Sequence, residues 1–438
     1  MVKHTLLFFD NLDAMINEML ISFIWRQRLF PPSLFTVDNK KVDVLSPGTL
    51  NSDQGPDFIG SELYLDNTLW SGNVEIHVKS SDWLVHCHQL DRNYDNVICH
   101  VVWNYDADVY SFLGDKIPTI ELSSQIPSHL LSNYEYLMQN QSSIPCANLI
   151  GDVPRHIVFN MLETCFFESL GTKMKYVDAM CRKTSSNLDE ASYCLISRSF
   201  GVKVNNDPFE ATALALPLNI LMRYYGSPTT VESLLFGQAN LLSDKYSDDY
   251  PRLLLSEYSF YAKKHNLTPQ MSASWKLLRL HPANFPCVRM AQLAVFLNND
   301  FKGLDSLLSL SSVRDVYSSF MVGINDYWSN HVIFDKTTVP KNRTIGCFSV
   351  DIIIINAIVP ILYYYGKTHH LSLICDKALD LIENVSAENN KMVRLWKSLG
   401  ITPLNAVHSQ ALIYLKREYC DKRRCLQCKI GSKIISSS

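Results

Sequence analysis

Gly72-Asn73-Val74-Glu75-Ile76-His77-Val78-Lys79 is the stretch that decides the fold of the first part of this chain. It follows Gly55-Pro56-Asp57-Phe58, and the turn-type residues Asp66-Asn67-Thr68 lie between the two runs, with apolar residues on either side. This arrangement predicts two strands joined by a tight connection. Because side chains alternate between the two faces of a strand, the valine and isoleucine residues of the first run form a core face.

The other face of the predicted strand carries an acid, an imidazole and an amine in successive positions, at Glu75, His77 and Lys79. Asp57, on the neighbouring strand, can join them across the pair. The remainder of the chain shows no comparable concentration of reactive side chains. We therefore predict that Asp57, Glu75 and His77 converge on one point, with Lys79 and Glu18 nearby.

The residues around this hairpin predict a mixed sheet with a covering helix. Apolar residues between Leu12 and Ile24 recur with helical spacing, and Glu18 lies at the edge of that apolar stripe. Residues 97–103 and 117–122 have the composition of further strands. Residues 10–125 are therefore expected to form one α/β domain built on a mixed sheet.

The pattern changes after Ile144-Pro145-Cys146, where long amphipathic stretches follow and strand patterns are nearly absent. The fold class predicted is α+β, with an N-terminal mixed-sheet domain and a large all-helical region. The expected boundaries are 1–140 for the sheet domain and 141–415 for the helical region. A basic, cysteine-rich tail, 416–438, is expected to pack back on the junction of the two.

Composition and charge exclude several classes of protein. The chain has 438 residues, 47% hydrophobic and 19% charged, and its net charge of −3 gives no general basic surface, so binding to DNA or RNA would need local basic patches. Its most apolar run, Ile352–Tyr365, is shorter than a bilayer crossing. Without a visible secretory signal, and with too few cysteines for a disulfide scaffold, it is expected to be cytoplasmic, with no membrane contact.

Several runs together resemble, over essentially the full length of the chain, the uncharacterised bacterial family called domain of unknown function 2851. Two of these runs are the hairpin motifs quoted above. The others are Ser81-Asp82-Trp83, Asn206-Asp207-Pro208-Phe209-Glu210, Leu235-Phe236-Gly237-Gln238-Ala239, Pro282-Ala283-Asn284-Phe285-Pro286 and Cys425-Leu426-Gln427-Cys428-Lys429-Ile430-Gly431. This resemblance identifies membership of a family but implies no activity.

A second resemblance, confined to residues 10–125, is to the PD-(D/E)XK nuclease superfamily. In that superfamily a first helix carries a Glu, a hairpin carries Pro-Asp, and the next strand carries Asp/Glu-x-Lys; here the order is Glu18, Pro56-Asp57 and Glu75-x-His77. The resemblance implies a restriction-endonuclease-like fold and a divalent ion, Mg²⁺ or Mn²⁺, held by Asp57 and Glu75, with Glu18 as a possible third ligand. Such an ion polarises a phosphoryl group and helps to generate hydroxide.

The chain departs from the nuclease pattern at one position, because His77 occupies the lysine slot and the amine appears two residues later, at Lys79. His77 can act as a base, or as a further ligand that favours Mn²⁺ over Mg²⁺. Two functions therefore stay open: a metal-dependent nuclease acting on DNA or RNA, and a non-catalytic scaffold that binds nucleic acid or protein. In a scaffold, Asp57 would cap backbone amides, and Glu75 and Lys79 would form a solvated pair.

Two other groups of polar residues are candidates for binding. One is a three-histidine metal site, for which the sequence places no carboxylate, formed by His86, His88 and His100. The other is a group around a turn between two helices that can hold a substrate phosphate or a carboxylate of a partner, formed by Arg279, Asn284 and Arg289. The two arginines can instead brace helix ends by bonding terminal carbonyls.

Cysteines near the C-terminus predict a metal site of a different kind. Cys420, Cys425 and Cys428 lie in a basic run, and the Cys-x-x-Cys at its end places two thiolates on one ion. We predict that Cys146 is the fourth ligand and ties the tail to the junction of the two regions. The arrangement resembles that of some PD-(D/E)XK nucleases, in which one upstream and three downstream cysteines hold an iron–sulfur cluster. Zinc, an iron–sulfur cluster and free thiols all stay open.

Overall fold

The computed structural model describes residues 15–437, apart from 271–273, 278–279, 300 and 322. The chain divides into two compact units. The first, here called the N-terminal unit, comprises Met1–Met161 together with Leu415–Ser438. The second, the helical unit, comprises Leu162–Tyr414. Each is described by itself.

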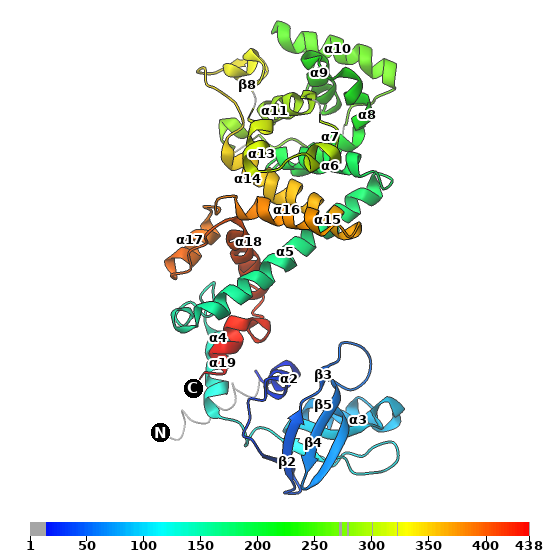
Figure 1. Ribbon diagram of the computed structural model, residues 1–438, viewed down its shortest axis with the longest axis vertical. Helices are drawn as coiled ribbons and strands as arrows, with labels where there is room; N and C mark the ends of the chain where they lie inside the picture. The colour runs from blue at the N-terminus through cyan, green and yellow to red at the C-terminus, as the bar shows by residue number, and fades with distance from the viewer. Residues whose placement is uncertain (1–14, 271–273, 278–279, 300, 322, 438) are drawn as a thin grey trace. The chain divides into compact units, whose positions relative to one another are not determined.

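A seven-stranded mixed sheet forms the centre of the N-terminal unit (Figure 1). The strand order is β1-β2-β4-β5-β6-β7, with β3 paired to β4. Neighbours from β1 to β5 are antiparallel, whereas β5, β6 and β7 are parallel to one another. The strands are β1 (Leu34–Phe35), β2 (Lys41–Ser46), β3 (Thr49–Leu50), β4 (Phe58–Leu65), β5 (Thr68–Lys79), β6 (Val97–Asn104) and β7 (Thr119–Glu121). The expected N-terminal mixed sheet is thus confirmed.

The β4–β5 hairpin is the pair that the sequence predicted. Leu65 pairs with Thr68 across the turn, where Asp66 has a left-handed backbone with φ of 51°. Gly72 is required by a close approach of the chain, because a Cβ atom there would lie 2.6 Å from the carbonyl oxygen of Asn96, just before β6. At the other end of the hairpin, Phe58 pairs with Val74, which places the residue before β4 beside the end of β5 that carries the polar side chains.

Helix α2 (Glu18–Gln27) packs against β5 and β6. Asn17 caps it, because its side-chain oxygen accepts a hydrogen bond from the backbone N–H of Leu20 at 3.0 Å. The helix was expected over 12–24; among the described residues it begins at Glu18 and extends to Gln27, and the part of the expectation before residue 15 lies outside the described chain. Glu18 is therefore in the first turn of the helix.

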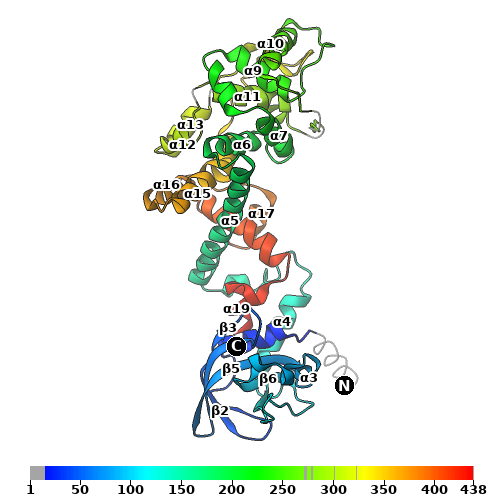
Figure 2. The ribbon, with the colours of Figure 1, turned by 90° about the vertical axis from the view of Figure 1, so that its right-hand side faces the viewer.

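The C-terminal segment is part of the N-terminal unit. Its last helix, α19 (Lys429–Ile435), lies beside α4 (Ser128–Gln139), as both views show (Figures 1 and 2). The side-chain amide of Asn133, on α4, donates hydrogen bonds to the carbonyl oxygens of Ile434 and Ser437, at 3.1 and 2.8 Å. These contacts join residues about three hundred positions apart in the sequence.

The helical unit confirms a mostly helical remainder. Its first helix, α5 (Arg155–Lys183), begins in the N-terminal unit. The α-helices that follow are α6 (Leu188–Phe200), α7 (Asn206–Ala215), α8 (Leu218–Leu221), α9 (Pro228–Gln238), α10 (Asp249–His265), α11 (Pro286–Asn298), α12 (Leu304–Leu308), α13 (Val313–Phe320), α14 (Cys347–Ile353), α15 (Val359–Thr368), α16 (Ser372–Glu383), α17 (Lys391–Ser398) and α18 (Ala406–Tyr414).

The expectation of an all-helical region is wrong in one detail. A small antiparallel pair, β8 (His331–Ile333) and β9 (Lys336–Thr337), turns at Asp335, which has a left-handed backbone with φ of 61°. The carboxylate of Asp335 accepts a hydrogen bond from the backbone N–H of Ser247 at 2.7 Å. Strands of three and two residues are too short to show a period of two in the sequence.

The most apolar segment of the helical unit forms a continuous helix over Cys347–Thr368, longer than the run expected from sequence. Its 22 residues have the length and composition of a membrane-spanning helix. Of its most apolar window, 61% is buried inside the unit, as in the core helix of a globular fold. Length and composition alone are weak evidence for a bilayer crossing.

Close packing between α9 and α10 in the helical unit predicts that one added methyl group will lower the stability of the fold. A Cβ atom on Gly237, in α9, would lie 2.1 Å from the ring of Tyr258 on α10. We expect Gly237→Ala to lower the free energy of unfolding by about 1–3 kcal/mol, the usual cost of overpacking.

Gly171→Ala is the matched control, because open space surrounds that position in α5. It should leave stability unchanged or raise it by up to about 1 kcal/mol. Chemical denaturation of both variants measures the difference; equal effects would contradict the tight contact.

Candidate metal centre and active site

The hairpin places two carboxylates side by side. Asp57 directly precedes β4, and its backbone N–H donates a hydrogen bond to Oε2 of Glu75 at 3.0 Å. In return, Oδ2 of Asp57 accepts a hydrogen bond from the backbone N–H of Ile76 at 3.1 Å. This reciprocal pair fixes both side chains relative to the backbone, so their proximity is built into the register of the two strands.

Three histidines lie together, and the carboxylate of Glu75 is close to two of them, His77 and His88. Nε2 of His77 lies 3.0 Å from Nδ1 of His86, and Oε1 of Glu75 lies 3.6 Å from Nε2 of His77 and 3.3 Å from Nε2 of His88. One ligand atom from each histidine lies within 4.8 Å of the others. A single ion can therefore contact all three imidazoles.

The short segment after β5 brings His86 and His88 to the same place. His86 ends α3 (Asp82–Val85), and His88 begins the 3₁₀ turn η1 (His88–Leu90). Cys87, between them, has a left-handed backbone with φ of 61°, which reverses the direction of the chain. Two residues that would otherwise diverge thus face one another.

A buried apolar cluster packs beside the segment that carries His86 and His88. Trp83, Tyr94 and Val97 belong to one buried core. The ring of His88 stacks on that of Tyr94, with 3.8 Å between centroids. His86 is exposed, so the group of histidines is accessible to solvent on its side while the opposite side is walled by protein. This combination of a rigid floor and an open side suits a site that admits a ligand.

His100, on β6, lies behind His77. Its Nε2 is 2.8 Å from Nδ1 of His77, and its side chain is fully buried. Burial, together with neighbouring histidines, lowers the pKa of His77 to about 2 and that of His100 to about 3. Both imidazoles are therefore neutral, which is the form that binds a metal. A partner on the second ring nitrogen fixes the orientation of a ligating histidine, and His100 is placed to be that partner.

The carboxylates destabilise one another in their ionised forms. Burial and the negative charges of Glu75 and Glu18 together raise the pKa of Asp57 to about 7, although the N–H of Ile76 opposes the shift. Desolvation also raises the pKa of Glu18, with His86 opposing and Glu75 reinforcing the shift. Glu18 therefore lies within electrostatic reach of the site, at the start of α2. Acids crowded in this way are stabilised when a cation lies among them.

The donor set fits a metal ion that accepts nitrogen ligands. Around a tetrahedral ion with bonds of about 2.0–2.1 Å, ligand atoms are separated by about 3.4 Å. Three of the separations are of this size, 3.0 Å for His77–His86, 3.6 Å for Glu75–His77 and 3.3 Å for Glu75–His88, and the three histidine atoms all lie within 4.8 Å of one another. Three imidazoles with one carboxylate favour Mn²⁺, Fe²⁺ or Zn²⁺ over Mg²⁺, which prefers oxygen.

The structure does not bring every predicted residue to this group. Lys79 is exposed at the end of β5, its backbone N–H donates to Asp82 at 2.9 Å, and its charge acts on Asp106. His86 and His88 join His77 and Glu75 instead of forming a separate site with His100. The signal in the sequence was the His-x-His pair, which follows the short helix after the strand. The left-handed turn at Cys87, which directs both rings inward, cannot be read from the sequence.

One family matches the chain. Its description is Protein of unknown function (DUF2851), and the match covers residues 18–391 of the 438. The chain belongs to the DUF2851 family. No curated protein and no solved structure matches it. The DUF2851 match begins at Glu18 and includes Asp57, Glu75 and the histidines, whereas Cys420, Cys425 and Cys428 lie beyond it.

The arginine group expected to hold phosphate lies in the helical unit of this DUF2851 chain. Arg279 is outside the described residues. Arg289 is buried, and its guanidinium donates hydrogen bonds to the side chains of Asn284 (2.6 Å), Ser349 (2.6 Å) and Gln292 (3.1 Å). These neutral partners hold together α11, α14 and the turn before α11. The arrangement is that of an internal brace.

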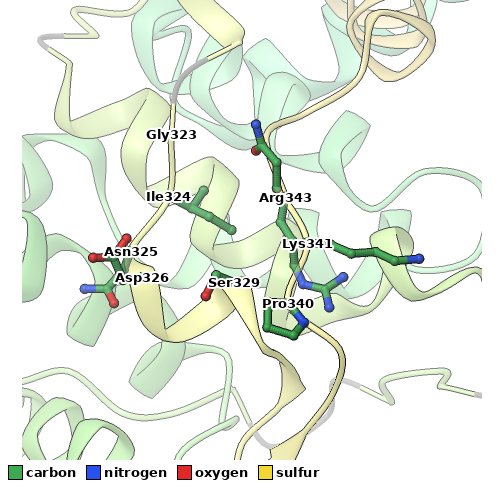
Figure 3. A pocket seen from close by; sticks show the side chains of 9 residues that line it. Gly323, Ile324, Asn325, Asp326, Ser329, Pro340, Lys341 and Arg343 are labelled. Carbon is green, nitrogen blue, oxygen red and sulfur yellow. The ribbon is translucent and has the colours of Figure 1, made fainter.

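A surface hollow of about 370 Å³ also lies in the helical unit (Figure 3). Asn325, Asp326 and Ser329 line it together with Pro340, Lys341 and Arg343. Figure 3 shows the side chain of Lys341 extending away from Asn325 and Asp326. The guanidinium of Arg343 donates to the carbonyl oxygen of Trp328 at 2.7 Å and to Thr338 at 2.9 Å. Among the described residues that line it, the hollow therefore has no convergent set of ligand or catalytic atoms.

Proposed function

We propose that the N-terminal unit is a metal-dependent phosphodiesterase that cleaves DNA or RNA. The observation that carries this proposal is the grouping of His77, His86 and His88 around one point, with the carboxylates of Glu75 and Asp57 beside it. The proposed enzyme is cytoplasmic, in keeping with twelve free cysteines, and holds nucleic acid through local basic patches.

Each residue has a distinct role in the proposed reaction. Glu75 and the three histidines hold the ion, and His100 orients His77. A bound ion of this kind polarises a phosphoryl oxygen and lowers the pKa of a coordinated water. Asp57 is not needed to complete the donor set, so it is free to orient the attacking water and accept its proton. Glu18, whose charge acts on Asp57, is the candidate carboxylate for binding a further cation with it.

The order of elements supports a restriction-endonuclease-like arrangement. Helix α2 carries Glu18, the β4–β5 hairpin carries Asp57 and Glu75, and α3 then leads to β6, which is parallel to β5. This helix, hairpin, helix, strand order is that of the PD-(D/E)XK pattern that the sequence resembles. In place of the lysine of that pattern, the chain offers three imidazoles, so the proposed reaction depends on Mn²⁺ or a similar ion.

One observation favours a second candidate, a non-catalytic scaffold that binds nucleic acid or protein on the same fold. Lys79 is exposed, and its amine acts on Asp106. Without a cation from the protein to stabilise a pentavalent phosphate, the metal centre would serve structure alone.

A cleavage assay separates the two. Purified chain is incubated with single-stranded DNA, double-stranded DNA or RNA in Mg²⁺, Mn²⁺ or Zn²⁺. We expect cleavage in Mn²⁺ to exceed that in Mg²⁺, and Asp57→Ala to abolish it. Glu62→Gln is the control, because Glu62 is an exposed carboxylate on β4 of the same hairpin. Protein that binds Mn²⁺ at the histidine site but cleaves none of these substrates would support the scaffold.

A further inference from the structure

Four cysteines from distant parts of the sequence lie together in the N-terminal unit, apart from the histidine site. Cys146 precedes α5, while Cys420, Cys425 and Cys428 lie in the C-terminal segment. All four are buried, with 7–8% of each residue exposed. Every pair among them interacts electrostatically, so the four thiols share one neighbourhood, although no three of their sulfur atoms lie within 4.8 Å of one another. None of them is in a disulfide.

The backbone around the Cys-x-x-Cys pair is shaped to support thiolates. The backbone N–H of Cys428 donates to the carbonyl oxygen of Cys425 at 3.2 Å, which closes a tight turn. Burial raises the pKa of Cys428, and hydrogen bonds to its sulfur from the backbone N–H groups of Gly431 and Ile430 lower it. Gly431 is required here, because a Cβ atom would lie 2.4 Å from the carbonyl oxygen of Cys425. The glycine thus allows two amides to point at one sulfur.

A cation lies within reach of the same group. Arg423 is within electrostatic reach of Cys425. Nη1 of Arg423 is buried and has no hydrogen-bond partner among the described residues. Its Nη2 donates to the carbonyl oxygen of Asn140 at 2.6 Å, and the amide of Asn140 donates to the carbonyl oxygen of Pro145 at 2.7 Å. Arg423 therefore joins the tail to the segment that carries Cys146 and offers an unpaired N–H to an anion.

We propose that Cys146, Cys420, Cys425 and Cys428 bind a metal centre as thiolates, and that this centre fastens the C-terminal segment to the rest of the N-terminal unit. Four thiolates are the full ligand set of a structural zinc ion and of the common iron–sulfur clusters. The thiol protons are released to solvent on binding. The negative charge of four thiolates is offset by the metal, by the two amides and by Arg423. With no ligand position left open, the centre is structural, and it does not depend on the proposed nuclease activity.

Metal analysis of the full-length chain, purified without oxygen, tests this site. A zinc centre yields stoichiometric zinc in colourless protein, and replacement by Co²⁺ yields thiolate-to-cobalt charge-transfer bands. A cluster yields iron and acid-labile sulfide in brown protein. Either result supports the thiolate centre. Protein with neither metal at these cysteines would overturn it.

Variants identify the ligands. We expect Cys146→Ser and Cys425→Ser to lose this metal and its spectrum, and both to speed proteolytic removal of the C-terminal segment. Cys347→Ser is the control, because Cys347 is exposed in the helical unit. Glu75→Gln should retain the thiolate centre. Loss of metal from the cysteines can therefore be distinguished from loss of metal from the histidine site. Full retention of metal by Cys146→Ser would overturn the assignment of four cysteines.

A measurement on the unaltered protein covers the case in which cysteine variants do not fold. Alkylation of native protein, followed by mass spectrometry, reports which thiols react. We expect the four cysteines to be protected together and to become reactive together after metal is removed by a chelator. Alkylation of these positions that is independent of the chelator would overturn the proposal.

Discussion

Replacing Glu75 by glutamine is expected to weaken binding of Mn²⁺ by more than about 100-fold, since loss of a hydrogen-bond partner outside the ligand set alone costs about 10–100-fold. Glu75 contributes the negative charge of the donor set and lies 3.3–3.6 Å from ring nitrogens of His77 and His88. Glutamine retains the shape of the side chain and an oxygen that can accept the N–H of Asp57. The change therefore removes charge with little change in packing.

Calorimetric titration with Mn²⁺ measures this effect. Manganese is chosen because thiolates select softer metals, so the cysteine group contributes little to the signal. Glu62→Gln, on the exposed face of β4, should bind Mn²⁺ as the unaltered chain does. An unchanged affinity in Glu75→Gln would show that the three histidines and Glu75 do not form one site.

Replacing Asp57 by asparagine is expected to reduce the cleavage rate by about 10²–10⁴-fold, the usual contribution of a positioned general base. Asparagine still accepts the hydrogen bond from the N–H of Ile76, so the hairpin keeps its register. Metal affinity should change much less than in Glu75→Gln, because Asp57 lies beside the donor set. Single-turnover kinetics with saturating Mn²⁺ measure the rate separately from binding.

The same substitution should stabilise the metal-free protein. The pKa of Asp57 is raised to about 7, so the ionised carboxylate is disfavoured in the folded state. A raised carboxyl pKa makes the fold lose stability as pH rises from about 4, the unfolded value, to about 7. Asp57→Asn removes this penalty, and we expect a gain on the order of 2 kcal/mol at neutral pH, fading below about pH 4. A loss of stability at neutral pH would mean that the carboxylate is well accommodated without a cation.

The sheet and the two carboxylates could be predicted because both depend on short-range rules. Alternation along residues 72–79 gives β5 its two faces, and the Asp66 turn sets the register that brings Asp57 to Glu75. A prediction of this kind needs only the period of the strand and one turn. The mostly helical remainder follows in the same way from its period of 3.6.

The remainder of the site could not be predicted, because it depends on backbone angles and on distant contacts. The left-handed conformation of Cys87 directs His86 and His88 towards His77, and a non-glycine residue gives little warning of it. The orientation of Lys79 depends on where β5 ends. Arg289 was predicted to bind phosphate because the sequence does not show which side chains pair with it. Its buried partners include Ser349, which is far from it in the sequence.

The chain leaves the N-terminal unit near Met161 and returns to it at Leu415. During synthesis on the ribosome, therefore, the sheet is finished early, but the surface of α4 that α19 covers stays bare until the entire helical unit has been made. Proteins fold domain by domain as they emerge, and exposed apolar surface at that stage invites aggregation. A fragment ending at residue 161 would lack α19 permanently, so the surface of α4 would stay uncovered. Leu130 and Leu137 of α4 are buried in the full chain. Expression of the sheet alone should thus require the last two dozen residues, supplied as a fusion or as a separate peptide.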